Sequence, residues 1–193
     1  MRASPSKLFA LVAGGFLLIG LLLGAITVER FVSSAPETIH RYMRLSGYIS
    51  VALTTTGTLV IYILTGIFTW GLGVFVNMEP SKISLTYACC WLIGLGGLFH
   101  IVSFIFANAY LFDHLALFRG EQLVYFLEKA MYQTHWYRWQ QWLEAAFFIT
   151  APLTFGLSLY RKEKEHAGAK GILGAASTLF LLALLAFLRS ALR

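Results

Sequence analysis

The hydrophobic pattern of this chain consists of long stretches without Asp, Glu, Lys or Arg, separated by short charged segments. These uncharged stretches cover residues 8–28, 45–78, 83–112, 145–160 and 171–188. A helix needs roughly 20 apolar residues to cross a hydrocarbon layer of about 30 Å, and the first three stretches each reach that length. The fourth gains Trp142 and Leu143 on its N-terminal side, and the fifth is rich in Leu and Ala.

This pattern predicts an all-α fold in which residues 1–193 form a single transmembrane domain. The five predicted spans are residues 8–28, 45–76, 84–112, 142–160 and 171–189. Four spans are the alternative, if one of the two shorter stretches does not cross. The first stretch is longer than the roughly 7–15 apolar residues of a secretory signal, so we expect it to be retained as a membrane helix.

Composition agrees with a polytopic integral membrane protein. Hydrophobic residues make up 58% of the chain and charged residues only 12%, whereas a soluble domain has about 25% charged residues. The net charge of +6 suits anchoring to anionic lipid, and we expect no nucleic-acid partner.

Basic residues beside the spans indicate the orientation of the chain. With a cytoplasmic N-terminus, the inner segments 1–7, 79–82 and 161–170 hold seven Lys and Arg in twenty-one residues. The outer segments hold eight in fifty residues. Because basic residues concentrate on the cytoplasmic side, we predict that the N-terminus is cytoplasmic and that the C-terminus lies on the opposite side.

The outer loop over residues 113–141 contains two patterns. Residues 121–134 predict a short interfacial amphipathic helix, since apolar side chains recur on one face at helical spacing. The following residues, 136–142, carry three Trp and one Tyr, which is typical of an aromatic belt at headgroup depth. Trp136 and Trp139 are therefore surface anchors or contacts for a lipid, a quinone or a partner subunit.

The second predicted span carries a stripe of small residues, mostly hydroxyl-bearing. At 100° per residue its members lie on one face: Gly47, Ser50, Thr54, Thr58, Thr65 and Thr69. These hydroxyls either bond to their own helix and allow neighbouring helices to pack closely, or they line a pathway for a small solute. In the first span, Gly20 and Gly24 have the spacing that permits close helix packing, although chance explains such a pair nearly as well.

The third predicted span contains His100, an ionisable side chain expected at depth in the membrane, where such groups are functional candidates. His114 follows fourteen residues later, on nearly the same helix face and about 21 Å along the axis. This interval resembles that of the di-haem cytochrome b family, and the resemblance implies that His100 and His114 bind haem b. No other predicted span contains a histidine. The alternatives are a packing role for His100, a haem ligand from a partner chain, or a haem held by His114 with His40 or His135.

A second resemblance concerns the start of the second span. The order Arg44-Leu45-Ser46-Gly47 is similar to an element that opens a helix in succinate dehydrogenase membrane anchors. The resemblance implies that Arg44 and Ser46 contact a quinone. The two extra residues between His40-Arg41 and Ser46 depart from the family pattern.

No motif for a metalloprotease, a phosphate-binding loop or a serine nucleophile occurs. We therefore predict a non-catalytic accessory or anchoring subunit of a larger membrane complex, possible partners being membrane lipids, other membrane subunits and a second copy of the chain. A respiratory or electron-transfer complex is one setting. The alternatives are an electron-transfer subunit that binds haem b or quinone, and a small channel or transporter.

Overall fold

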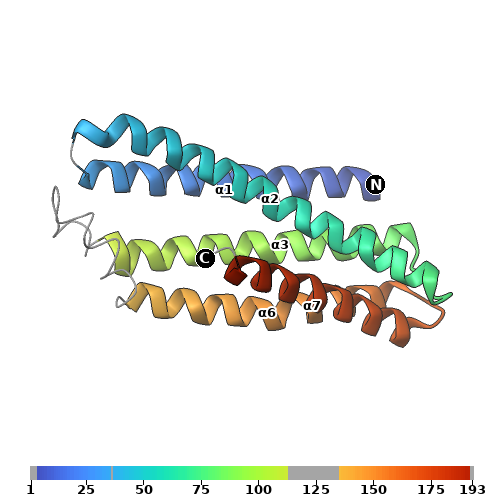
Figure 1. The fold of residues 1–193 in the computed structure, drawn as a ribbon. Helices are drawn as coiled ribbons and strands as arrows, with labels where there is room; N and C mark the ends of the chain where they lie inside the picture. Colours follow the sequence, from blue (N-terminus) through green and yellow to red (C-terminus); the bar gives the residue numbers. More distant parts are fainter. Residues whose placement is uncertain (1–3, 36, 113–134, 192–193) are drawn as a thin grey trace. The chain divides into compact units, whose positions relative to one another are not determined.

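The computed structural model describes residues 4–35, 37–112 and 135–191, and within these residues the fold is all-helical (Figure 1). Its elements are α1 (Pro5–Ser34), a 3₁₀ turn η1 (Glu37–Ile39), α2 (His40–Phe75), α3 (Lys82–Ala107), a π-helical segment η2 (Asn108–Phe112), α6 (His135–Lys162) and α7 (Ala167–Ala191). The amphipathic helix expected over residues 121–134 lies outside the described residues.

Five helices are long and apolar enough to cross a membrane by length and composition, as the uncharged stretches predict. The all-helical architecture and the number of candidate spans are thus confirmed, and they indicate a multi-pass membrane protein. The aromatic segment over residues 136–142 is the start of α6, which begins at His135. The segment contains neither Gly nor Pro, so nothing in it opposes continuing the helix toward the surface.

The helices contribute to two compact units. Unit 1 comprises residues 1–16, 58–96 and 146–193, and unit 2 comprises residues 17–57 and 97–145. The long helices α1, α2, α3 and α6 each supply one part to each unit, and α7 belongs to unit 1.

In unit 2, α1 and α2 pack as a close antiparallel pair. A Cβ atom added at Gly20 would meet Thr55, one added at Gly24 would meet Val51, and Gly47 faces Val28 in the same way. The contacts on α1 are four residues apart toward its C-terminus, and their partners on α2 are four residues apart toward its N-terminus. Four residues are about one helical turn, so the same face of each helix is in contact throughout. The Gly20 and Gly24 spacing, which the sequence alone does not distinguish from chance, therefore marks a helix contact.

The polar end of this pair is an ion pair. Arg44 donates to both carboxylate oxygens of Glu29 at 3.0 to 3.2 Å, and the hydroxyl of Tyr48 donates to the same carboxylate. The side chains of Arg44 and Glu29 are 51% and 44% exposed. An exposed pair of this kind contributes little stability, so its main effect is to set the register of the two helices near their connection.

In unit 1, two residues of the hydroxyl stripe, Thr65 and Thr69, contribute to helix packing. Thr65 donates to the carbonyl of Ile61 at 2.9 Å, and Thr69 donates to the carbonyl of Thr65 at 2.7 Å. Both side chains are buried. Because each hydroxyl hydrogen is used within α2, these two residues favour the packing interpretation of the stripe over a solute pathway.

A buried ion pair joins the start of α3 to the α6–α7 connection. Glu163 accepts a hydrogen bond from the backbone N–H of Ser81 at 2.7 Å and one from the ammonium of Lys170 at 2.9 Å. The side chains of Glu163 and Lys170 are only 7% and 11% exposed. Ser81 caps α3, since its hydroxyl accepts the N–H of Ser84. The carboxylate thus lies at the positive end of the α3 dipole, where an anion is stabilised.

The pKa of Glu163 reflects these neighbours. Burial raises the pKa, but hydrogen bonds from Lys170, Ser84 and Ser81 outweigh burial and hold the pKa at about 2, against an ordinary value of 4.5. A lowered folded-state pKa stabilises the fold at pH values above the ordinary pKa, and the stabilisation is lost as the pH falls through the folded-state value.

We therefore expect the protein to lose stability between about pH 5 and pH 2, with Glu163 accounting for about 3 kcal/mol of the loss. Thermal unfolding in detergent, followed at several pH values, would measure this loss. Glu163→Gln should flatten the pH dependence, and the difference between the two curves isolates this carboxylate from the others. Parallel curves would show that Glu163 is not stabilised in the folded state.

Candidate functional site

A cavity of about 440 Å³ lies in unit 2 among α1, α2, α3 and the start of α6. Its lining consists of Gly20, Leu23, Gly24, Thr27, Phe31, Ser50, Val51, Thr54, Thr55, His100, Ser103, Phe104, Ala107, Leu111 and Trp136. Binding sites for small molecules have volumes of roughly 300–1,000 Å³, so this cavity has the size of one.

Helical spacing explains why small and polar side chains meet here. On α3, His100, Ser103 and Ala107 are three and four residues apart and share one face. On α1, Gly24 and Thr27 share a face in the same way. Because the facing positions carry small side chains, the helices do not fill the space between them.

The end of α3 adds a local irregularity beside the cavity. The helix changes from α to π geometry over η2, and Leu111 of this segment lines the cavity. Asn108 donates from its side-chain amide to the carbonyl of Phe104 at 2.9 Å, so its polar group is satisfied within the helix. Single π-helical turns inside α-helices are often found at functional sites, which makes this end of α3 a candidate on independent grounds.

The hydroxyls of the lining present acceptors to the cavity. Thr27 donates its hydroxyl hydrogen to the carbonyl of Leu23 at 2.9 Å, and Ser103 donates to the side-chain oxygen of Gln140 at 2.7 Å. A hydroxyl whose hydrogen is used still has oxygen lone pairs that can accept a hydrogen bond. Thr27 and Ser103 are thus two candidate acceptors for a ligand that carries a donor.

Trp136 provides the donor. Its indole Nε1 is buried and has no hydrogen-bond partner among the described residues. An indole N–H can only donate, and leaving a buried donor unsatisfied costs about 1–3 kcal/mol. A ligand with an accepting oxygen at this position would remove that cost.

The lining contains no Asp, Glu, Lys or Arg within the part of the chain that the structure describes. Three aromatic rings, Phe31, Phe104 and Trp136, form part of the wall. An uncharged ligand therefore suits the described lining, in which His100 is the single ionisable side chain that could face a buried charge. A flat ring would suit the aromatic part of the wall.

The structure brings together six of the residues singled out in the sequence. Gly20 and Gly24 of the first span and Ser50 and Thr54 of the hydroxyl stripe line this cavity. His100 and Trp136 line the same cavity. Arg44 is paired with Glu29, and Ser46 donates to the carbonyl of Met43 at 3.3 Å, so neither contributes to the lining. His114 lies outside the described residues.

Trp139 belongs to a neighbouring surface of unit 2. Its ring stacks on Phe106 at a centroid distance of 5.0 Å. It also lines a smaller cavity of about 350 Å³, together with His135, Arg138 and Trp142. Trp139 is 43% exposed and Trp142 is 71% exposed, as expected of an aromatic belt that faces lipid or a partner.

The residues that line this cavity do not supply the two axial histidines that a bis-histidine haem needs. His100 is the single histidine of the described lining, which includes neither Met nor Cys. Among the described residues, no three His, Cys, Asp or Glu side chains are grouped as metal ligands. The described lining of this cavity therefore offers one axial ligand at most, which does not fit a bis-histidine haem.

Three residues of this region escape sequence reasoning. Thr27 and Ser103 each look like an isolated polar residue in an apolar stretch, and Gln140 is one of several polar residues in the aromatic segment at the start of α6. Ser103 follows His100 by three positions, and this spacing alone could have indicated that Ser103 shares a helix face with His100. Nothing in the sequence pairs Ser103 with Gln140, because they are thirty-seven residues apart on different helices.

Comparison with protein-family models, with curated proteins and with solved structures finds no match.

Proposed function

We propose that this protein is a non-catalytic subunit of a membrane-embedded electron-transfer complex and that it binds a quinone in the cavity of unit 2. The observation that carries the proposal is the buried, unpartnered Nε1 of Trp136 in the lining. It requires an accepting oxygen on the ligand, and a quinone carbonyl supplies one.

Three further properties support this ligand class. A quinone is uncharged, in keeping with the uncharged lining, and its flat ring suits a wall that includes Phe31 and Phe104. Its reduced form carries hydroxyls, which could donate to the lone pairs of Thr27 and Ser103. The cavity thus offers hydrogen-bond partners to both the quinone and the quinol. A subunit that binds a molecule of the quinone pool needs partners for both forms.

The role as a subunit is supported by the exposed aromatic surface at the start of α6. Trp139 and Trp142 expose large apolar rings beside the cavity-lining Trp136. Exposed aromatic residues of this kind are enriched where membrane proteins meet lipid headgroups or partner chains.

Trp136→Phe should weaken binding of a short-tailed benzoquinone about tenfold, because the variant loses one buried hydrogen bond but keeps an aromatic ring. Isothermal titration calorimetry of the purified protein in mild detergent would measure the dissociation constants. The exchange also removes an unsatisfied donor, so the variant should fold at least as well as the natural chain.

Trp139→Phe is the matched control, since it makes the same exchange outside this cavity and should leave the dissociation constant unchanged. Ala107→Phe should abolish binding by filling the cavity. Absence of saturable binding by the natural chain, or equal losses in both Trp variants, would refute the quinone site.

The subunit role has a separate test. Extraction from the native membrane in mild detergent should yield the chain together with partner proteins in fixed stoichiometry, identified by mass spectrometry. A chain that elutes alone and monodisperse would contradict the role as a subunit, without bearing on the quinone site.

A further inference from the structure

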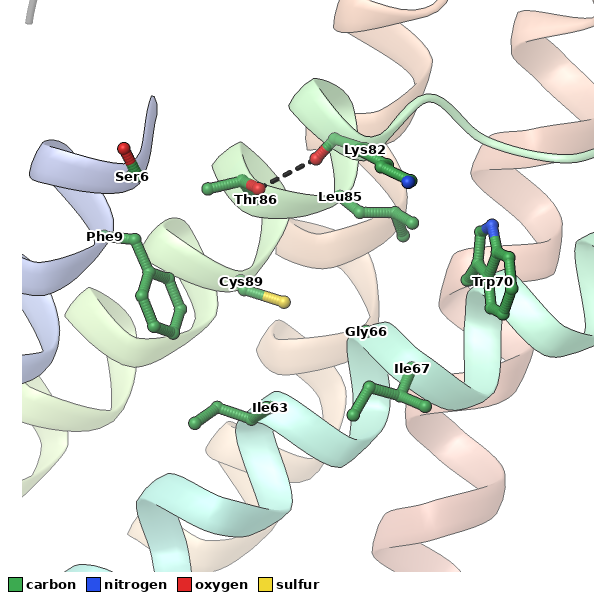
Figure 2. Close-up of a pocket in the computed structure, with 10 residues that line it drawn as sticks. All are labelled: Ser6, Phe9, Ile63, Gly66, Ile67, Trp70, Lys82, Leu85, Thr86 and Cys89. Carbon is green, nitrogen blue, oxygen red and sulfur yellow. Dashed lines mark hydrogen bonds between the residues drawn. The ribbon is translucent and has the colours of Figure 1, made fainter. Parts of the chain in front are cut away.

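Unit 1 contains a second cavity, of about 520 Å³, which has a different chemical character (Figure 2). It lies among the N-terminal turns of α1, the C-terminal half of α2 and the start of α3. Figure 2 shows Ser6, Thr86 and Lys82 along one edge and Ile63 and Ile67 along the opposite edge. The cavity is thus amphipathic, with a cationic and hydroxyl-bearing edge and an apolar interior.

The polar edge coincides with the ends of the helices. Ser6 is in the first turn of α1, and Lys82 is the first residue of α3. Trp70, in the last turns of α2, donates from its indole N–H to Glu79 at 2.6 Å, an arrangement typical of tryptophan at the headgroup level. Ile63 lies two turns further into α2, so the apolar side of the cavity extends toward the hydrocarbon layer.

The charged groups of this end favour an anion at Lys82. Lys170 is engaged with Glu163, and Lys162 lies 4.3 Å from the centre of the Tyr87 ring. For Lys82, in contrast, no hydrogen bond or ion pair of the ammonium is found among residues 4–35, 37–112 and 135–191. The hydrogen bond between Lys82 and Thr86 does not involve the ammonium, since the Thr86 hydroxyl donates to the backbone carbonyl of Lys82 at 2.8 Å.

The other charged residues near this edge include more basic than acidic side chains. Lys7 follows Ser6 on α1 and is exposed, whereas the acid closest in sequence, Glu79, accepts the hydrogen bond of Trp70. The described segments 4–7, 79–82 and 161–170 belong to unit 1 and together hold six basic and three acidic residues. This end of unit 1 is therefore complementary to an anionic headgroup.

We propose that the cavity of unit 1 binds one acyl chain of an anionic phospholipid, with the lipid phosphate against the ammonium of Lys82. The bilayer interior is as apolar as the cavity, so an acyl chain gains little by moving from one to the other. The apolar part of the cavity therefore does not distinguish one lipid from another. The charge at Lys82 decides the selection and favours phosphatidylglycerol over phosphatidylcholine. The proposal is independent of the quinone site, which belongs to unit 2.

Native mass spectrometry tests the proposal. The full chain is released from micelles that contain equal amounts of phosphatidylglycerol and phosphatidylcholine, and the retained lipid is counted. The natural chain should retain one phosphatidylglycerol in preference. Lys82→Gln should reduce that preference about fivefold, the effect expected from one basic residue at the surface.

Lys164→Gln is the matched control, since it makes the same change of charge at an exposed position of the α6–α7 connection. It should reduce the preference for phosphatidylglycerol much less than Lys82→Gln does, because Lys164 does not line the cavity. Ile67→Trp should displace the lipid while keeping Lys82, because Ile67 lines the cavity and is 57% exposed, which leaves room for the larger ring without disturbing the core.

Equal retention of the two lipids by the natural chain would overturn the proposal, and so would equal effects of Lys82→Gln and Lys164→Gln. Retention unaffected by Ile67→Trp would place the lipid outside the cavity. Addition of inorganic phosphate should not displace the lipid, and displacement would show that Lys82 binds free phosphate instead.

Discussion

Lys170→Met should lower the free energy of unfolding by about 3–5 kcal/mol, the loss typical of removing one partner of a buried ion pair. The ammonium of Lys170 lies 2.9 Å from the carboxylate of Glu163, and both side chains are almost fully buried. Without the ammonium, the carboxylate keeps its hydrogen bond from the Ser81 N–H but has no counter-charge. Titration with sodium dodecyl sulfate in mixed micelles, followed by circular dichroism, would measure the change.

Two further variants identify the cause of this loss. Glu163→Gln combined with Lys170→Met should recover most of the stability, because an uncharged pair no longer leaves a buried charge uncompensated. Lys164→Met removes a basic residue from the same connection at an exposed position, and it should change the stability by less than about 0.5 kcal/mol. A double variant that is no more stable than Lys170→Met alone would attribute the loss to packing rather than to charge.

Gly156→Ala should destabilise the contact between α6 and α7 by about 1–3 kcal/mol, although alanine is the better helix former. A Cβ atom at Gly156 would lie 2.6 Å from the carbonyl oxygen of Gly171 and 3.0 Å from the Cβ of Ala175. The first of these atoms belongs to the backbone, so α7 as a whole must move to relieve the clash. The buried rings and side chains around the contact, such as Phe155 and Leu159, would lose packing with it.

The control is the same exchange at Gly168, in the first turn of α7, where an added Cβ would have nothing within 4 Å. Gly168→Ala should be neutral or stabilising by about 0.4–1 kcal/mol, because alanine restricts the unfolded chain. The two variants should thus have opposite signs in the same unfolding titration. A Gly156→Ala variant as stable as Gly168→Ala would show that the two helices can separate at little cost.

The candidate site was predictable only in part. His100 stands out in the sequence because an ionisable side chain in an apolar span is costly and has to be satisfied. Trp136 stands out as a member of an aromatic segment at the start of α6. The sequence does not indicate that these two residues line one cavity, since that depends on which faces of α3 and α6 meet. The quinone contact that the resemblance implies for Arg44 and Ser46 stays a prediction, and the sequence did not indicate that Arg44 pairs with Glu29.

The sequence by itself determined the helical architecture and the number of candidate spans. A backbone in hydrocarbon must satisfy its own hydrogen bonds, so an uncharged apolar stretch of sufficient length has few alternatives to a helix. For Gly20 and Gly24 the sequence left a helix contact and a chance spacing open, and the structure decided for the contact. Only the tertiary structure decided which partners meet across helices: Glu163 with Ser81, Ser103 with Gln140, and Trp136 with no partner at all among the described residues. These pairings depend on the rotation and register of each helix, and an apolar stretch constrains both only weakly.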